Sequence, residues 1–236
     1  MKKYSSHTFY CFSPPVMLAT FIIETALLIY TFVRYRTTAL VRTVMAMLFF
    51  LALFQLAEYN VCGRLGLSAA VWSRTGYVAI TMLPPLGIHL VQLIAKRYWR
   101  WLTWLAYTTG ALWALMFGLS ERAFTGYVCA GNYVIFQLND FASRMYGAYY
   151  YLWLLIGIAL AAYFAVQAKQ HIKEALILQI TGYLVFLLPT TIIGDLNPAT
   201  RAGIPSIMCG FAVLYAVILV FGVLPRVQRA EQVDNK

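Results

Sequence analysis

The sequence is poor in charged residues. Asp, Glu, Lys and Arg together make up 11% of its 236 residues, whereas 62% are hydrophobic. Soluble domains carry roughly 25% charged residues. This scarcity of charge excludes an ordinary water-soluble domain and indicates an integral membrane protein.

Seven apolar runs are long enough to cross a bilayer as helices, which takes about 20 residues each. They cover residues 15–33, 40–61, 71–95, 99–119, 145–167, 175–193 and 203–224, and the longest connection covers residues 120–144. We therefore expect an all-α fold, with a single seven-helix membrane domain over residues 1–236. The first run has spanning length and no small-residue cleavage site follows it, so we expect no cleaved signal peptide.

Acidic residues are rarer than basic ones, 8 against 18, which gives a formal net charge of +10. The basic residues gather in alternate connections and after the last run, at Arg34, Arg36, Arg42, Lys96, Arg97, Arg100, Lys169, Lys173, Arg226 and Arg229. Cytoplasmic loops of membrane proteins carry such an excess of Lys and Arg. We expect a protein of the bacterial inner membrane, with its N-terminus outside the cell and its C-terminus in the cytoplasm. We expect no nucleic-acid partner.

Only four cysteines are present. In this orientation Cys11, Cys62 and Cys129 lie at or beyond outer helix ends, on the oxidising side of the membrane, and Cys209 lies in the outer half of the last helix. We favour a Cys62–Cys129 disulfide, which would pin the long connection over the bundle. Free buried thiols are the alternative.

The 120–144 connection contains the stretch GYVCAGNYVIFQLND. Its β-branched and aromatic residues alternate on both sides of Ala130-Gly131-Asn132. Alternation on either side of a turn predicts a β-hairpin. We expect a short hairpin that forms an ordered lid on the outer face, between the fourth and fifth helices.

Motifs for chemistry are missing. The last helix has no lysine for a retinal Schiff base, and His7 and His171 lie outside the predicted spans, which leaves His89 only a methionine as a second haem ligand. No C-x-x-C, H-E-x-x-H, Walker or nucleophile-elbow pattern occurs. We expect neither an enzyme nor a bound cofactor or metal.

Polar side chains recur at helical spacing in four of the predicted helices, so each of these helices has one polar face. Polar groups are costly in hydrocarbon, and these faces should therefore point into the bundle. We expect an outward-facing ligand pocket there, lined by Glu24, Gln55, Glu58, Thr81, Tyr149, Gln179 and Tyr183, with His89 as support beneath it. The alternative is a hydrogen-bonded network that holds the helices together.

Glu24 is the most unusual of these residues. It lies near the expected bilayer midplane, and no Lys or Arg falls in the central part of any predicted helix. We expect its carboxyl group to be protonated, to hydrogen bond to Gln or Thr neighbours, or to bind a cation or a ligand amine.

The stretch ITMLPPLGIHLVQLI, residues 80–94, places two prolines inside the third apolar run. Proline lacks the backbone N–H and displaces the carbonyl one turn earlier, so the carbonyls of Ile80 and Thr81 should be freed. We expect a kink at which a donor in the bundle interior satisfies the Thr81 carbonyl. Gly87 should let a neighbouring helix approach closely at this kink.

The same stretch resembles the third helix of the seven-helix sensor modules at the N-terminus of bacterial histidine kinases and cyclases, through Pro84, Pro85 and His89. The resemblance implies seven helices, an outside N-terminus and a sensor role. In that family the seventh helix continues into a cytoplasmic signalling domain, whereas here only RVQRAEQVDNK follows Pro225. The resemblance thus implies a free-standing sensor that acts through a separate protein partner.

Our hypothesis is a membrane sensor that binds a small amphipathic, cationic or lipid-like molecule in the pocket and acts through a partner. One alternative is a small secondary transporter, with Glu24 as a proton or cation site and Pro84, Pro85 and Pro189 marking broken helices. The other is an accessory subunit of a larger membrane complex.

Overall fold

The computed structural model describes residues 14–63, 66–120, 123–130, 133–197, 200 and 203–234. Cys11 and the Gly131-Asn132 turn lie outside these ranges.

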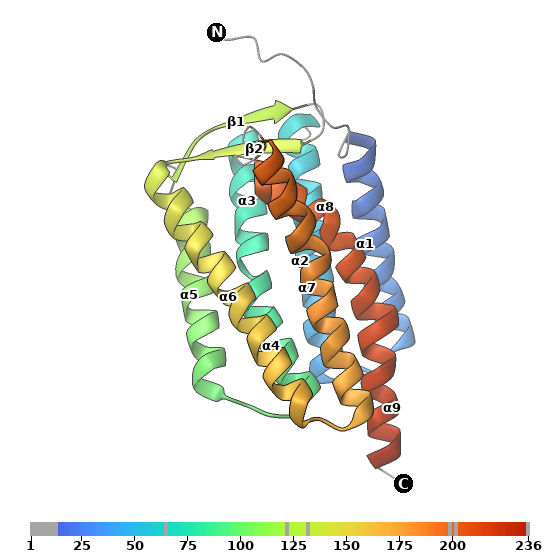
Figure 1. Ribbon diagram of the computed structural model, residues 1–236. Helices are drawn as coiled ribbons and strands as arrows, with labels where there is room; N and C mark the ends of the chain where they lie inside the picture. Colours follow the sequence, from blue (N-terminus) through green and yellow to red (C-terminus); the bar gives the residue numbers. More distant parts are fainter. Residues whose placement is uncertain are drawn as a thin grey trace.

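Seven helical segments are long and apolar enough to cross a membrane, as predicted, which makes the chain a multi-pass membrane protein (Figure 1). In chain order they are α1 (Pro14–Arg34), α2 (Ala39–Gly63), α3 (Ala69–Thr81) with α4 (Leu83–Ala95), α5 (Arg100–Leu119), α6 (Asp140–Gln167), α7 (Gln170–Leu196), and α8 (Ile204–Val217) with the π-helical η3 (Ile218–Val223) and α9 (Leu224–Asp234).

The third span is broken where the prolines predict it. α3 ends at Thr81 and α4 begins at Leu83, so that Pro84 and Pro85 fall in the first turn of α4, where a missing N–H costs least. The Tyr149 hydroxyl, from α6, donates to the Thr81 carbonyl at 2.9 Å. The expected interior donor at the kink is thereby confirmed.

Several helix ends differ from the sequence prediction, by five residues or more at the starts of α6 and α7 and at the end of the last helix. α6 starts at Asp140 rather than near residue 145, because the Asn139 side chain caps it by accepting a hydrogen bond from the Ala142 N–H at 2.8 Å. The last helix runs to Asp234 rather than 224, through a polar segment that apolar run length does not detect.

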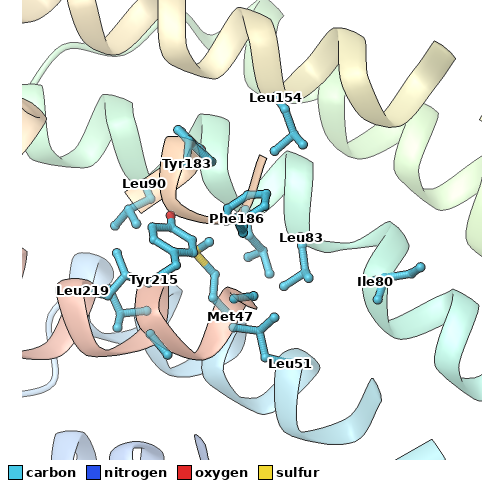
Figure 2. Packing of buried hydrophobic residues seen from close by; sticks show 14 of the residues in the cluster. Met47, Leu51, Ile80, Leu83, Leu90, Leu154, Tyr183, Phe186, Tyr215 and Leu219 are labelled. Carbon is cyan, nitrogen blue, oxygen red and sulfur yellow. The ribbon is translucent and has the colours of Figure 1, made fainter. Parts of the chain in front are cut away.

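The helices form one bundle around a continuous core. α4 packs against α2, α5, α6 and α7, which makes it the central helix in the half of the bundle far from the hairpin. Figure 2 shows buried side chains from α2, α4, α6, α7, α8 and η3 meeting there, among them Met47, Leu51, Leu83, Leu90, Leu154, Phe186, Tyr215 and Leu219. Large apolar side chains such as Val166, 86% exposed, cover the perimeter, where lipid would solvate them.

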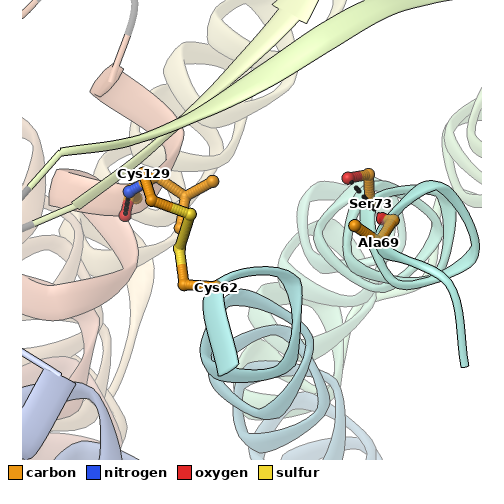
Figure 3. Close-up of a disulfide and its surroundings, with 6 residues drawn as sticks. Cys62, Ala69, Ser73 and Cys129 are labelled. Atoms are coloured by element: carbon orange, nitrogen blue, oxygen red, sulfur yellow. Dashed lines mark hydrogen bonds between the residues drawn. A yellow bond between two sulfur atoms is a disulfide. The ribbon is translucent and has the colours of Figure 1, made fainter. Parts of the chain in front are cut away.

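The predicted hairpin is present and is pinned as expected. β1 (Phe124–Ala130) and β2 (Tyr133–Leu138) pair antiparallel and lie across one end of the bundle (Figure 1). Cys129 of β1 forms a disulfide with Cys62 at the end of α2, with 5.9 Å between their Cα atoms (Figure 3). Beneath the hairpin, the Tyr77 ring of α3 lies 5.2 Å from the Phe124 ring and 5.3 Å from the Phe136 ring.

Candidate functional site

A cavity of about 650 Å³ lies beneath the hairpin. Its walls come from α3, both strands, α6 and the first turns of α8. The residues that line it are Tyr77, Ile80, Thr125, Ile135, Phe136, Gln137, Leu138, Ser143, Tyr146, Gly147, Tyr150, Tyr151, Ile204, Pro205, Met208 and Cys209. Small-molecule pockets typically have volumes of about 300–1,000 Å³. The cavity therefore has room for a small organic molecule.

The cavity leads from an exposed rim to a buried inner end. Gln137 of β2 and Ser143 of α6 are exposed, whereas Tyr150 and Cys209 are buried. A molecule that entered at the rim would leave water as it moved toward α8.

The lining combines aromatic and apolar surface with uncharged polar groups. Four tyrosines, together with Thr125, Gln137 and Ser143, offer hydroxyl and amide groups, and none of the lining side chains described is charged. Tyrosine presents an apolar ring with a hydrogen-bonding hydroxyl at its tip. Such walls suit an amphipathic molecule rather than a strongly charged one.

α6 leaves space for an occupant at Gly147. A Cβ atom placed on this glycine would have no heavy atom within 4 Å beyond its own turn of helix. Ser143, Gly147 and Tyr150 recur at intervals of four and three, so they share the face of α6 that borders the cavity.

The eight residues expected to form the site lie elsewhere in the bundle. Seven of them are buried, as predicted, at 8% exposure or less, and His89 is half-buried. None lines the large cavity, and Tyr183 instead lines a void of about 20 Å³ that shares Tyr150, Met208 and Cys209 with it. The structure groups the eight residues in four separate places.

The first group lies at the break between α3 and α4. The Thr81 hydroxyl donates to the Tyr77 carbonyl at 2.6 Å and shares a hydrogen bond with the Tyr146 hydroxyl at 3.1 Å. Tyr149 is bonded to the Thr81 carbonyl, and Tyr146 lines the cavity. This group connects the cavity wall to the helix break.

The second group joins α7 and α8. The Gln179 amide donates to the Tyr215 hydroxyl, and Tyr183 is hydrogen bonded within the same group. The Tyr183 hydroxyl fits between Gly87 of α4 and Gly157 of α6. Beside Gly87 the space is taken by the Tyr183 side chain of α7, rather than by the closely approaching helix that the sequence predicts.

The third group contains the two buried acids. Four buried polar atoms in this group have no hydrogen-bond partner among the described residues. They are both carboxylate oxygens of Glu24, Oε1 of Glu58 and Nε2 of Gln55. The Glu24 and Glu58 carboxylates are close enough to repel each other if both were ionised. The Cys209 side chain lies near both carboxylates. The hydrogen bonds expected from Gln or Thr neighbours to Glu24 are therefore not found in the described part of the chain.

Glu58 also connects to the hairpin. Its carboxyl is hydrogen bonded to the Ser206 hydroxyl of α8, and the Ser206 oxygen accepts from the Val134 N–H of β2 at 3.3 Å. Ser206 thus joins a buried acid, α8 and the lid.

His89 faces α5 rather than the bundle interior. Its Nδ1 lies 3.0 Å from the Tyr107 hydroxyl of α5, within hydrogen-bond distance. This contact joins α4 to α5, and the supporting role expected for His89 beneath a pocket stays a prediction.

Sequence reasoning assigned none of the cavity-lining residues to the site. Tyr146 and Tyr150 lie in the same tyrosine-rich turns as the predicted Tyr149, and Cys209 was noted only as a cysteine of the last helix. One available signal was the combination of the predicted lid with a small residue, Gly147, about two turns inside α6.

No three His, Cys, Asp or Glu side chains in the described ranges lie close enough together to hold a metal ion. The cavity under the hairpin is therefore assigned by its shape and by its uncharged, hydroxyl-rich walls. No protein-family model and no curated protein matches the chain.

Proposed function

We propose that the protein is a membrane receptor that binds a small amphipathic molecule in the cavity beneath the hairpin and passes the change to a protein partner. The cavity itself carries this proposal, because it is large enough for a ligand and roofed by a lid that a disulfide fixes to α2. Its uncharged aromatic walls favour a lipid-like or aromatic ligand with hydroxyl or amide groups.

The hairpin end is proposed to face outside the cell. Described basic residues gather mainly at the opposite end, at Arg34, Arg36, Arg42, Lys96, Arg97, Arg100, Lys169, Lys173, Arg226 and Arg229. An excess of Lys and Arg favours the cytoplasmic side, and a disulfide favours the oxidising side. Both observations support a cavity that is loaded from outside.

The route from ligand to partner is proposed to run through α6 and α4. An occupant would contact Tyr146, whose hydroxyl is bonded to Thr81 at the end of α3. Thr81 adjoins the break at Met82, and α4 continues from there to the opposite end of the bundle. A hinge between two packed helices can convert a local contact into a helix movement. A partner at that end would sense the movement.

Filling the cavity at Gly147 should abolish ligand binding. We expect Gly147→Leu to fold, because the position is open and leucine favours a helix over glycine. Small molecules that co-purify with the wild-type protein should be lost from this variant, which mass spectrometry of organic extracts would measure. In a Cys11→Ser background, labelling of Cys209 by N-ethylmaleimide should also slow by at least about tenfold, the factor that corresponds to 1.4 kcal/mol.

Ala148→Leu is the matched control. Ala148 is the next residue of α6 and is exposed on the outside of the bundle, so the same side chain is added away from the cavity. It should keep both the co-purified molecules and the labelling rate. Equal retention and equal labelling in the Gly147 and Ala148 variants would show that the cavity is not a ligand site.

A second candidate function is ion-coupled transport, and the buried acids favour it. The carboxyl groups of Glu24 and Glu58 lie near each other, and three of their four oxygens have no hydrogen-bond partner among the described residues. Such a pair in hydrocarbon is stable with protons or a bound cation. Glu24 would then be the ion site of a small secondary transporter.

Glu24→Gln distinguishes this candidate. In vesicles with an imposed potassium diffusion potential and an entrapped pH-sensitive dye, a transporter should carry protons inward, and Glu24→Gln should stop the flux while Glu174→Gln keeps it. Glu174 is the fitting control because it lies near the start of α7, ion-paired with Arg226 at 3.4 Å. Wild-type flux no greater than that of protein-free vesicles rules out proton-coupled transport.

A further inference from the structure

A second cavity lies at the end of the bundle opposite the hairpin, where α4, α6 and α7 meet. It has a volume of about 210 Å³ and is lined by three basic residues, Lys96, Arg97 and Lys169, above an apolar floor that includes Phe164 and Ile172. The three basic residues are exposed at the rim, whereas Phe164 is 2% exposed. The site combines positive charge at its entrance with an apolar base.

The end of α4 holds two of the cations in place. Lys96 adopts a left-handed backbone with φ of 53°, which a non-glycine residue takes at some cost. The Lys96 N–H donates to the Leu93 carbonyl at 3.2 Å and the Arg97 N–H to the Gln92 carbonyl at 3.1 Å, which closes the helix end. Lys96 and Arg97 are thereby fixed at the cavity rather than in a free loop.

Arg97 is also fixed through its side chain. Its guanidinium donates to Oε1 of Gln167 at the end of α6, with 2.6 Å between the two atoms. Gln167 is neutral, so this bond orients the guanidinium without cancelling its charge. The remaining N–H groups of a guanidinium can pair with two oxygens of one anion.

The third wall is the start of α7. Lys169 is its N-cap residue, no side chain caps the helix, and its first turn contains no acidic residue. The first backbone N–H groups of a helix attract anions. Glu174, one turn further along, is ion-paired with Arg226 and does not line the cavity.

We propose that this cavity binds a phosphate group, through Lys96, Arg97, Lys169 and the start of α7. Phosphate oxygens match the forked geometry of arginine and the N–H groups of a helix start. The volume lies below the roughly 300 Å³ of sites for drug-sized ligands, so it fits a head group better than a whole molecule. Basic pockets between membrane helices on the cytoplasmic side suit anionic lipid head groups, and the apolar floor would contact the glycerol and the first methylenes of such a lipid.

In the lipid arm of the test, the protein is placed in vesicles that contain equal amounts of phosphatidylglycerol and phosphatidylcholine. It is then released from the vesicles, and native mass spectrometry counts the lipids that it retains. The wild-type protein should retain phosphatidylglycerol at least about fivefold over phosphatidylcholine, about 1 kcal/mol by the affinity relation. Arg97→Gln/Lys169→Gln should reduce the preference to near unity. Lys96→Asn should weaken it, while asparagine tolerates the left-handed backbone.

Arg36→Gln is the matched control, because Arg36 is an exposed base in the connection between α1 and α2 and does not line the cavity. It should keep the lipid preference. A second arm measures the melting temperature in phosphatidylcholine alone, with and without inorganic phosphate. Stabilisation by phosphate in the wild type but not in the double variant, without any lipid preference, would identify a free phosphate-bearing ligand. Neither effect, or equal loss in Arg36→Gln, would overturn the phosphate site.

Discussion

Loss of the Cys62–Cys129 disulfide should destabilise the protein and loosen the lid over the cavity. The bond joins residues 67 positions apart, across the whole of α3, α4 and α5. Chain entropy gives about 4 kcal/mol for a loop of this length, as an upper figure, because membrane helices persist in the unfolded state and already shorten the loop. Titration with sodium dodecyl sulfate should give a lower free energy of unfolding for Cys62→Ser/Cys129→Ser than for the wild type.

The same change has a local readout at the hairpin. Without the disulfide, the lid is held by the Val134–Ser206 hydrogen bond and by the packing of Tyr77 against Phe124 and Phe136. Chymotrypsin should cleave within residues 123–138 several-fold faster in the double variant. Cys11→Ser keeps the disulfide and should behave as the wild type. If cleavage and stability are unchanged, the disulfide does not anchor the lid.

The helices and the lid were predictable because their signals are local. Apolar run length defines each span, Pro84 and Pro85 mark the break, and alternation of β-branched and aromatic residues marks the hairpin. The start of α6 was missed because the Asn139 cap depends on one polar side chain ahead of the apolar run. Local signals thus gave the elements, with errors at their ends.

The burial of the polar residues was also predictable, but their grouping was not. Helical spacing placed Glu24, Glu58 and Gln179 on inward faces, where they lie. Which inward residue meets which depends on the rotation of each helix and the order of helices around the bundle. No local pattern reports that rotation, so one pocket was expected where the structure has separate groups.

The limit of prediction from the sequence is clearest at the tyrosines of α6 beside the cavity. Tyr149 and Tyr150 are both buried, yet only Tyr150 lines the cavity. The Tyr149 hydroxyl instead donates a hydrogen bond to the Thr81 carbonyl. Neighbouring residues on a helix point about 100° apart. A rotation of that size would exchange their roles, and only the packed structure decides between them.

Two glycines that accommodate tyrosines should be intolerant of alanine. A Cβ on Gly87 would overlap the Tyr183 hydroxyl, and a Cβ on Gly182 would overlap the ring of Tyr215. Overpacking of a core costs about 1–3 kcal/mol, partly offset by the better helix propensity of alanine, about 1 kcal/mol. Detergent-induced unfolding should show lower stability for Gly87→Ala and Gly182→Ala, and Gly147→Ala, where the space is open, should not lose stability.

The two substitutions should differ in how they can be rescued. At Gly87 only the hydroxyl oxygen overlaps, and Cζ of Tyr183 would lie at 3.4 Å, so Tyr183→Phe should restore part of the stability lost in Gly87→Ala. At Gly182 the overlapping atoms are Cδ2 and Cε2 of the ring, and Tyr215→Phe leaves them in place. Tyr215→Phe also removes the acceptor of the Gln179 amide, which costs about 1 kcal/mol. A double-mutant cycle should therefore give a favourable coupling for Gly87 with Tyr183 and none for Gly182 with Tyr215. The opposite pattern would mean that α7 packs on α4 and α8 through other contacts.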